Sequence, residues 1–320
     1  MNELLAGADI GGTTVKIGFI SNDGTIQDKW EIPTDLTNNG ENILPDIWAS
    51  IASKLQTPPF ENYSIKGIGV GAPGFVDTHT GVIAEAVNIG WKDVHLAEEL
   101  EKLANVPVYV ENDANIAVLG ENWVGAGNQS RNLIAITLGT GVGGGIIANG
   151  TILNGANGMA GEIGHIEVLE NGHLCNCGKR GCLETIASAT GIVRQGMEKV
   201  QANPDSLLAK VFQTEGNLTT QHIFELAKQG DPVSKEIIDY TIDVLGKTLS
   251  NMSMIINPSN ILIGGGVSNA GDYLIEAVTN AFRKHALPRI SEVCTIKVCQ
   301  LGNDAGIIGG AYLVHEKISD

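Results

Sequence analysis

The chain has 320 residues, enough for two domains that share a cleft, and its 43% hydrophobic and 18% charged content is typical of a globular protein. A net charge of −16 without any cluster of Lys and Arg argues against nucleic acid or anionic membrane as a partner. No apolar stretch is long enough to span a bilayer, and no charged and apolar leader opens the sequence, so we expect a protein of the reducing cytoplasm.

The first half of the chain alternates between short apolar runs and helical patterns. A predicted hairpin comes first, with strands over 4–10 and 15–20 and the turn Gly-Gly-Thr-Thr between them. Apolar residues at helical spacing then predict a helix over 42–56. Further strands are predicted at 25–32, 65–70 and 106–110, and further helices at 96–104 and 114–123.

The second half opens with a hairpin that is similar to the first. Its strands are predicted over 132–138 and 142–148 around a Gly-Thr-Gly turn, which suggests two related halves. Asp231 and Pro232 are typical cap and first-turn residues of a long helix. Further helices are predicted at 185–200, 219–229, 271–284 and 304–317, strands at 261–263 and 295–301, and a surface loop at 202–218. This alternation of strands and helices predicts an α/β fold.

Three of the five cysteines lie within eight positions, at Cys175, Cys177 and Cys182, and His165 precedes the first of them by ten residues. Three thiols and one imidazole complete a four-ligand zinc shell, and these ligand types favour zinc over magnesium or calcium. Cys175 and Cys177 are poorly placed for a disulfide, because neighbours two apart on an extended chain are about 7 Å apart. With all four positions filled by protein, we expect a structural ion.

Two carboxylates and three glycine clusters complete the set of polar motifs. Glu162 and Glu184 bracket the cysteine cluster, where a hydroxyl-rich ligand would lie against them. Residues 9–16 place Asp, Gly, Gly, Thr, Thr and Lys around a hairpin tip, which suits phosphates and water-bound magnesium. The turns 139–141 and 264–266 are similar, although each is also consistent with an ordinary tight turn.

Glu111, Asn112 and Asp113 follow a predicted strand and precede a predicted helix. This is the position at which α/β proteins place reacting groups. Asp113 would accept a proton from a sugar hydroxyl that Asn112 orients. Equally, Asp113 would serve as the cap of the following helix, and the spacing alone leaves both interpretations open.

Seven stretches together match one known family in order, and they extend over the whole chain. They are the residues 9–16, 71–74, 111–115, 138–144, 161–165, 175–184 and 264–268. The chain resembles the ROK family (repressor, open reading frame, kinase) of the sugar kinase, heat-shock ATPase and actin superfamily, and within it the bacterial glucokinases. Phe75 and Met159 are mild departures from the family pattern that would reshape the sugar pocket slightly.

The resemblance implies a two-domain actin-like ATPase fold of ribonuclease-H-like type, with an interdomain cleft. The smaller α/β domain would comprise residues 1–113 and 304–320, and the larger one residues 114–303 with the zinc site. It also implies ATP-dependent phosphorylation of glucose at the 6-hydroxyl, with ATP, Mg²⁺ and structural Zn²⁺ as ligands, and we expect a homo-oligomer, a dimer or tetramer.

The resemblance assigns roles to individual residues. Asp113 is implied to be the general base, and the sugar hydroxyls are implied to meet Asn112, Asp113, Glu162, His165 and Glu184. Asp9 is implied to lie near magnesium. The other residues implied to bind the nucleotide are Gly11, Gly12, Thr13, Thr14, Lys16, Thr140, Gly141, Gly265, Gly266 and Val267. Zinc is implied to lie on His165, Cys175, Cys177 and Cys182.

Three alternatives stay open. One is a kinase of the same family for another hexose, with N-acetylmannosamine and fructose as the main competitors of glucose. A second is a sugar-responsive transcription regulator, but such proteins carry a DNA-binding domain ahead of the first glycine tip, which begins here at Asp9. A third is a non-catalytic sugar-binding or scaffold protein, which the presence of both Asp113 and the phosphate tips disfavours.

Overall fold

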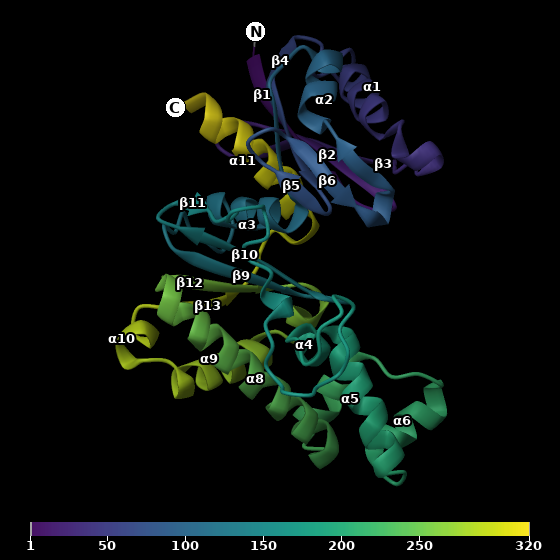
Figure 1. The fold of residues 1–320 in the computed structure, drawn as a ribbon, viewed down its shortest axis with the longest axis vertical. Helices are drawn as coiled ribbons and strands as arrows, with labels where there is room; N and C mark the ends of the chain where they lie inside the picture. Colours follow the sequence, from purple (N-terminus) through teal and green to yellow (C-terminus); the bar gives the residue numbers. More distant parts are fainter. Residues whose placement is uncertain (1, 320) are drawn as a thin grey trace. The chain divides into compact units, whose positions relative to one another are not determined.

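The computed structural model describes residues 2–319, which form two compact units. The first unit comprises the described residues up to Gln129, the segment Ile152–Ala160 and the described residues from Gln300 onward. The second unit comprises Ser130–Thr151 and Gly161–Cys299. Each unit is built on its own five-stranded sheet (Figure 1).

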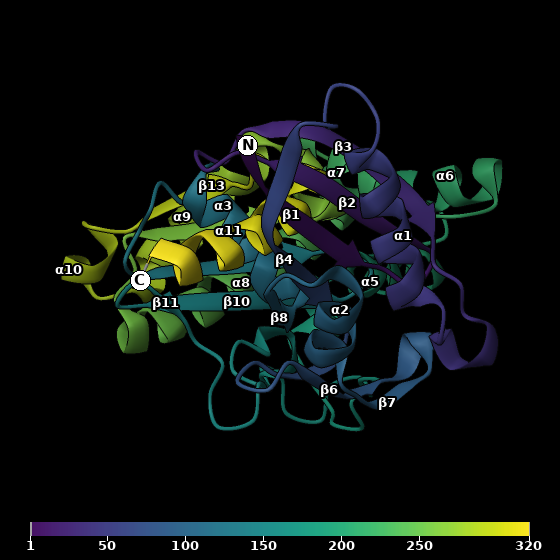
Figure 2. The ribbon, with the colours of Figure 1, turned by 90° about the horizontal axis from the view of Figure 1, so that it is seen from above.

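The first sheet has the strand order β3-β2-β1-β4-β8, in which β1, β2 and β3 are antiparallel and β4 and β8 run parallel to β1. Its strands are β1 (Asn2–Ile10), β2 (Thr14–Ile20), β3 (Ile26–Pro33), β4 (Tyr63–Ala72) and β8 (Val108–Asn112). Helices α1 (Ile43–Leu55) and α2 (Leu96–Ala104) cover one face, and α11 (Ala305–Ser319) lies along β1 and β4 on the other (Figure 2).

Glycines bring α11 against the backbone of this sheet and of α3 (Asp113–Trp123). A Cβ at Gly69 would lie 1.7 Å from the carbonyl oxygen of Gly310, and a Cβ at Gly309 would lie 1.7 Å from that of Ile116. Helix α3 therefore packs into the first unit, so the unit extends beyond residue 113, where the predicted smaller domain ends. Residues 152–160 and 300–303 also belong to this unit rather than to the region 114–303.

The second sheet repeats the order of the first as β11-β10-β9-β12-β13. Its strands are β9 (Leu133–Leu138), β10 (Val142–Ala148), β11 (Thr151–Ile152), β12 (Asn260–Gly264) and β13 (Thr295–Val298). Strand β10 is antiparallel to β9, and β12 is parallel to both β9 and β13. The first sheet has the same pattern, because β2 is antiparallel to β1, and β4 is parallel to both β1 and β8. The predicted likeness of the two hairpins is confirmed.

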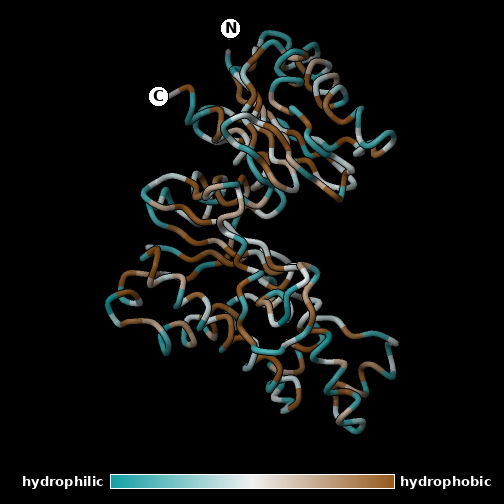
Figure 3. Tube along the Cα trace, viewed as in Figure 1, coloured by the Kyte–Doolittle hydropathy of each residue, from teal (hydrophilic) through white to brown (hydrophobic). Residues whose placement is uncertain are grey.

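Helices pack on the second sheet and bury its apolar side chains. They are α4 (Glu184–Ala187), α5 (Ala189–Ala202), α6 (Leu207–Glu215), α7 (Thr220–Lys228), α8 (Pro232–Ile256), α9 (Asp272–His285) and α10 (Pro288–Ser291). Ile136, Leu249 and Ile263 are among the fully buried residues of this core. Hydrophobic residues follow the strands in each unit (Figure 3). Among residues 2–319, none of the helices has both the length and the apolar character that a membrane crossing requires.

Several short elements differ from the sequence-based expectation. Strands β5 (Phe75–Asp77), β6 (Val82–Ala86) and β7 (Trp91–Val94) form a small antiparallel sheet. They are too short to show an alternating pattern. Helix α6 lies within the expected loop 202–218, where Ser206 caps it and Leu208 and Ala209 are buried. The expected helix 185–200 is divided at Ser188, whose side chain caps α5.

Single turns of 3₁₀ helix connect the longer elements. They are η1 (Thr37–Gly40), η2 (Val87–Ile89), η3 (Ile163–His165), η4 (Gly266–Ala270) and η5 (Gly302–Asp304). Two of them carry residues with predicted roles, because η3 ends at His165 and η4 begins at Gly266.

Candidate active site and metal centre

The tip of the β1–β2 hairpin presents bare backbone. The N–H of Gly11 donates to the carbonyl of Thr14 at 3.0 Å, and the carbonyl of Thr13 accepts from the N–H of Thr34 at 2.9 Å. A Cβ at Gly12 would meet no atom within 4 Å, so the fold itself leaves this position open. Such a tip allows phosphate oxygens to approach the main chain closely.

Asp9 lies on β1 next to this tip and pairs across the hairpin with Lys16. Burial, with a smaller contribution from the charge of Asp113 and against the opposing charge of Lys16, raises the pKa of the Asp9 carboxyl to about 6. Asp9 also lies against the first turn of α11, since a Cβ at Gly306 would be 2.5 Å from its Oδ2. Within the first unit, the fold thus brings Asp9 and Asp113 close enough for their charges to interact.

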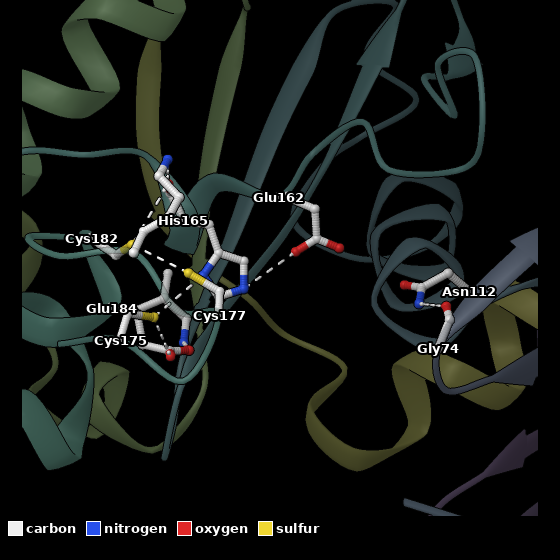
Figure 4. Close-up of polar contacts among 10 residues, drawn as sticks. Gly74, Asn112, Glu162, His165, Cys175, Cys177, Cys182 and Glu184 are labelled. Carbon is white, nitrogen blue, oxygen red and sulfur yellow. Dashed lines mark hydrogen bonds and ion pairs between the residues drawn. The ribbon is translucent and has the colours of Figure 1, made fainter. Parts of the chain in front are cut away.

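Asn112, rather than Asp113, is the cap of α3. Its Oδ1 accepts from the N–H groups of Ala114 at 2.9 Å and Asn115 at 3.3 Å, and its Nδ2 donates to the carbonyl of Gly74 at 3.2 Å (Figure 4). Asp113 is the first residue of the helix, and its Oδ1 accepts from the N–H of Ala114 at 2.8 Å. The capping role that the sequence assigned to Asp113 as an alternative therefore belongs mainly to its neighbour.

In the second unit, the ligand atoms of His165, Cys175, Cys177 and Cys182 all lie within 4.8 Å of one another (Figure 4). The Nδ1 of His165 is 3.6 Å from the Sγ of Cys175, and the Sγ atoms of Cys177 and Cys182 are also 3.6 Å apart. A tetrahedral zinc ion with Zn–S bonds near 2.3 Å has ligand–ligand edges of about 3.8 Å, shorter where nitrogen takes part. The donor set and its spacing therefore fit zinc.

The three thiols differ in acidity. Burial raises the pKa of the Cys182 thiol to about 12 and also raises the pKa of Cys175. The pKa of Cys177 lies below its ordinary value, because the backbone N–H of Lys179 donates to its sulfur. A divalent cation compensates for the charge of buried thiolates, so metal binding here would release protons.

Glu162 and Glu184 flank the cluster (Figure 4). The Oε2 of Glu162 is 3.9 Å from the Nε2 of His165, which leaves Nδ1 on the side of the thiols. Glu184 lies between the cluster and the β9–β10 hairpin, since its Oε1 accepts from the Sγ of Cys175 at 3.5 Å and its Oε2 from the N–H of Val142 at 3.0 Å. The N–H of Val142 and the thiol of Cys175 thus orient the carboxylate of Glu184, and the bond from Val142 persists when a metal replaces the thiol proton.

The tip of the β9–β10 hairpin is held by the start of α5. The N–H of Ala189 donates to the carbonyl of Gly139 at 2.8 Å, and the hydroxyl of Thr190 donates to that of Thr140 at 2.8 Å. A cavity of about 460 Å³ lies beside this tip. Its walls include Thr190, Arg194 and Thr219. None of these residues belongs to a sequence motif that would have predicted its place beside the tip.

The third glycine cluster borders a second cavity of about 280 Å³. Gly266 and Val267 line it on one side, and residues of α7 such as Phe224 and Lys228 line it on the other. Gly265 is required by the fold, because its φ is +81° and a Cβ would lie 2.5 Å from the carbonyl of Leu138. The interpretation of this cluster as a tight turn is therefore correct for Gly265, and the cavity begins at the next residue.

A comparison with known proteins identifies the family, because the sequence pattern of the ROK family matches residues 5–317. The chain belongs to the ROK family. It is 48% identical to a glucokinase of Halalkalibacterium halodurans, over 97% of this chain and 94% of the relative. It is also 37% identical to a glucokinase of Thermotoga maritima, over 98% of each.

A crystal structure of a ROK family glucokinase from Streptomyces griseus, in complex with glucose and AMPPNP, superimposes with a TM-score of 0.76. It is 34% identical and the match covers 98% of this chain and 99% of that one. The predicted α/β fold of the ROK proteins, which are actin-like ATPases, is confirmed.

Proposed function

We propose that this ROK protein is a glucokinase, which transfers the γ-phosphoryl group of ATP to the 6-hydroxyl of glucose. The observation that carries the proposal is the 48% identity to a glucokinase over nearly the whole of both chains. The site residues support it, because the strand-end aspartate, the glycine tips and the Cys/His cluster are all present in this one chain.

We assign Asp113 as the general base that takes the proton of the attacking hydroxyl. Phosphoryl transfer depends mainly on positioning and charge neutralisation, and a base adds on the order of 10²–10⁴ in rate. The structure supports the assignment in two ways: Asn112 supplies the helix cap, and Asp113 opens α3 at the end of a strand. The carboxylate of Asp9 stands nearby and would hold magnesium through water, where the ion neutralises phosphate charge.

We assign the remaining glucose contacts to Asn112, Glu162, His165 and Glu184. His165 suits two roles at once, because its Nδ1 faces the thiols and its Nε2 remains on the side of Glu162. All four groups form hydrogen bonds and none is a fixed cation, which favours a neutral polyol over an acidic sugar. A site that pairs each ring hydroxyl rejects an epimer by about 1–3 kcal/mol for each buried group left unpaired.

We assign the nucleotide to the glycine tips and the cavities beside them. The predicted phosphate ligands are Gly11, Gly12, Thr13, Thr14, Lys16, Thr140 and Gly141, and the predicted adenosine neighbours are Gly265, Gly266 and Val267. The cavity between Val267 and α7 supports the adenosine assignment. We also assign structural zinc to the Cys/His cluster and a homo-oligomeric state to the protein. We assign the cytoplasm as its location, because its proposed substrate ATP is available there.

A coupled phosphorylation assay across a panel of hexoses tests the proposal. We expect kcat/KM for glucose to exceed that for mannose, N-acetylmannosamine and fructose by about tenfold or more. If N-acetylmannosamine or fructose equals glucose, the glucokinase assignment is wrong while the kinase assignment stands. No phosphorylation of any hexose would exclude both.

The base assignment has its own test. Asp113→Ala and Asp113→Asn are each expected to lower kcat by at least about 10²-fold while leaving the circular dichroism spectrum unchanged, because neither side chain accepts the proton. Asp239→Ala is a matched control, since Asp239 is an exposed residue of α8 that pairs with Lys235. Near-normal turnover of the Asp113 variants would rule out this residue as the base.

A further inference from the structure

Glu111 is a buried carboxylate with no assigned role in the chemistry, and only 3% of its surface is exposed. Its Oε1 accepts from the backbone N–H of Asn112 at 2.8 Å and from the Nδ2 of Asn115 at 3.0 Å. Its Oε2 accepts from the Nδ2 of Asn154 at 2.9 Å. The carboxylate is thus held by three N–H donors, two of which come from the residues on either side of Asp113 and Ala114.

Asn154 ties a separate segment to this carboxylate. It belongs to Ile152–Ala160, which packs with the first unit although the second unit supplies the residues before and after it in the sequence. Its Nδ2 also donates to the hydroxyl of Thr78 at 3.1 Å, and its Oδ1 accepts from the Nδ2 of Asn115 at 3.2 Å. One amide therefore joins the segment to the β5–β6 connection and to the first turn of α3.

The segment approaches the first unit at a second point, Gly158. Gly158 has a φ of +80°, and a Cβ there would lie 2.6 Å from the carbonyl of Val76 in β5. The small sheet that includes β5 is in turn linked to Asn112, because the Nδ2 of Asn112 donates to the carbonyl of Gly74. The hydrogen bonds that Glu111 accepts and the one that Asn112 donates to Gly74 therefore fix the strand-to-helix junction on both sides.

The energetics explain why such a network has consequences for Asp113. A buried carboxylate is costly unless it is fully hydrogen-bonded, and removing one partner costs more than the bond contributes. The junction therefore has one strongly preferred geometry, in which the backbone at Asn112 and the side chain at Asn115 are both fixed by Glu111. Asp113 lies between them in sequence, so the direction of its carboxylate depends on the network.

We propose that Glu111, Asn115 and Asn154 form a carboxylate–amide clamp that positions Asp113, and that Glu111 and Asn154 are positioning residues for phosphoryl transfer. The inference rests on the proposed function, because it takes Asp113 as the base. Glu111 itself has both oxygens engaged and acts through its neighbour. A small misplacement of a base lowers the rate of the chemical step without a matching loss of substrate affinity.

A polarity swap tests the clamp. In Glu111→Gln, the new amide N–H group faces the Nδ2 of Asn154, so two donors oppose each other. In Asn154→Asp, two carboxylates face each other. In the double variant the amide of residue 111 donates to the carboxylate of residue 154, and the Thr78 hydroxyl reverses its direction. We expect each single variant to lower kcat about tenfold with glucose KM changed less than about threefold, and the double variant to recover to within about threefold of the parent.

The control is Asn203→Asp, an exposed asparagine whose Nδ2 donates to the carbonyl of Lys199, for which kcat should not change. The swap is then repeated in the Asp113→Asn background, where Glu111→Gln should cause no further loss because it acts through Asp113. Single variants with normal kcat, a double variant no better than the worse single, or a further tenfold loss in that background would each overturn the clamp. Normal turnover of Asp113→Asn alone would instead overturn the proposed base.

Discussion

The two hairpin tips, Gly11–Thr14 in the first unit and Gly139–Gly141 in the second, share a backbone pattern but have different surroundings. In each, the N–H of the first glycine donates at 3.0 Å to the carbonyl of the last tip residue. The first tip lies beside the charged pair Asp9 and Lys16 of its own hairpin. The second has no such pair in its strands, and its carboxylate, Glu184, comes from 42 residues further along than Val142.

The two sheets share one strand order, but their tips have different polar neighbours. In the first unit, charged groups gather at the end of the sheet, where burial and the nearby charge of Asp113 raise the pKa of Asp9. In the second unit, the carboxylate beside the tip accepts from the N–H of Val142 and, while the cluster holds no metal, from the thiol of Cys175. Under the proposed function, the first unit would concentrate charge for phosphoryl transfer, and the second would depend on a zinc-linked loop for rigidity.

The largest expected effect is the loss of the cluster. Cys182→Ala should abolish the proposed zinc site and leave little folded second unit, because the apparent binding free energy of structural zinc is about 10–16 kcal/mol and is coupled to folding. A chelator should likewise destabilise the second unit, which should then unfold in a separate transition at a lower temperature than the first unit. Elemental analysis and calorimetry measure both effects.

Cys294→Ala is the matched control for the cluster, because Cys294 is a buried thiol in the core of the same unit. It should keep about one equivalent of zinc per chain. Less than a tenth of an equivalent in the parent protein, with activity intact, would contradict the structural role of zinc and the contrast between the two units.

A smaller effect is expected from Asp9 in the absence of nucleotide and magnesium. Its carboxyl has a pKa of about 6 in the folded protein, against about 3.8 when unfolded, so the folded state binds the proton more tightly. The stability that Asp9 contributes through this tighter proton binding is therefore fully present below pH 3.8. It is lost as the pH rises through 6, and the total loss is at most about 3 kcal/mol. Asp9→Asn should remove this dependence and be more stable at pH 7, but should lose activity because it holds magnesium poorly.

Urea unfolding from pH 4 to 8 measures this contribution as the difference between the parent and Asp9→Asn. Asp28→Asn serves as the control, because Asp28 is a partly exposed residue of β3 that pairs with Lys54. A difference that stays constant across this range would show that Asp9 titrates near its ordinary pKa, and the two tips would then differ less than the structure indicates.

The smallest effect on stability is expected at the tips themselves. A Cβ at Gly12 or at Gly139 would meet no atom within 4 Å, so alanine at either position should change the free energy of unfolding by less than about 1 kcal/mol. If the tips hold phosphates, Gly12→Ala should nevertheless lower kcat/KM for ATP by about tenfold or more, since the Cβ blocks the approach to the backbone.

Gly265→Ala, unlike the two tip variants, is expected to lower the free energy of unfolding, and it therefore serves as the positive control for the stability measurement. Its positive φ and the nearby carbonyl of Leu138 predict a destabilisation of at least about 1–3 kcal/mol. Unchanged ATP kinetics in Gly12→Ala and Gly139→Ala would contradict the assignment of both tips to the phosphates.

The sequence by itself determined the features that depend on local spacing. The thiols and imidazole of the cluster lie within eighteen residues, from His165 to Cys182, and their spacing alone predicts one four-ligand site. Both hairpins follow from apolar runs around a glycine turn, and Asp231 and Pro232 mark the start of α8 as predicted. These signals are readable because the interacting residues are neighbours in the chain.

The tertiary structure alone decided where α3 and the segment Ile152–Ala160 belong, and what Glu111 does. Helix α3 joins the first unit because glycines allow its backbone to touch α11, which lies almost two hundred residues further along. Asn154 meets Glu111 across 43 positions of sequence. Such contacts arise from packing between distant segments, and neither hydrophobic periodicity nor residue spacing carries information about which distant amide satisfies a buried carboxylate.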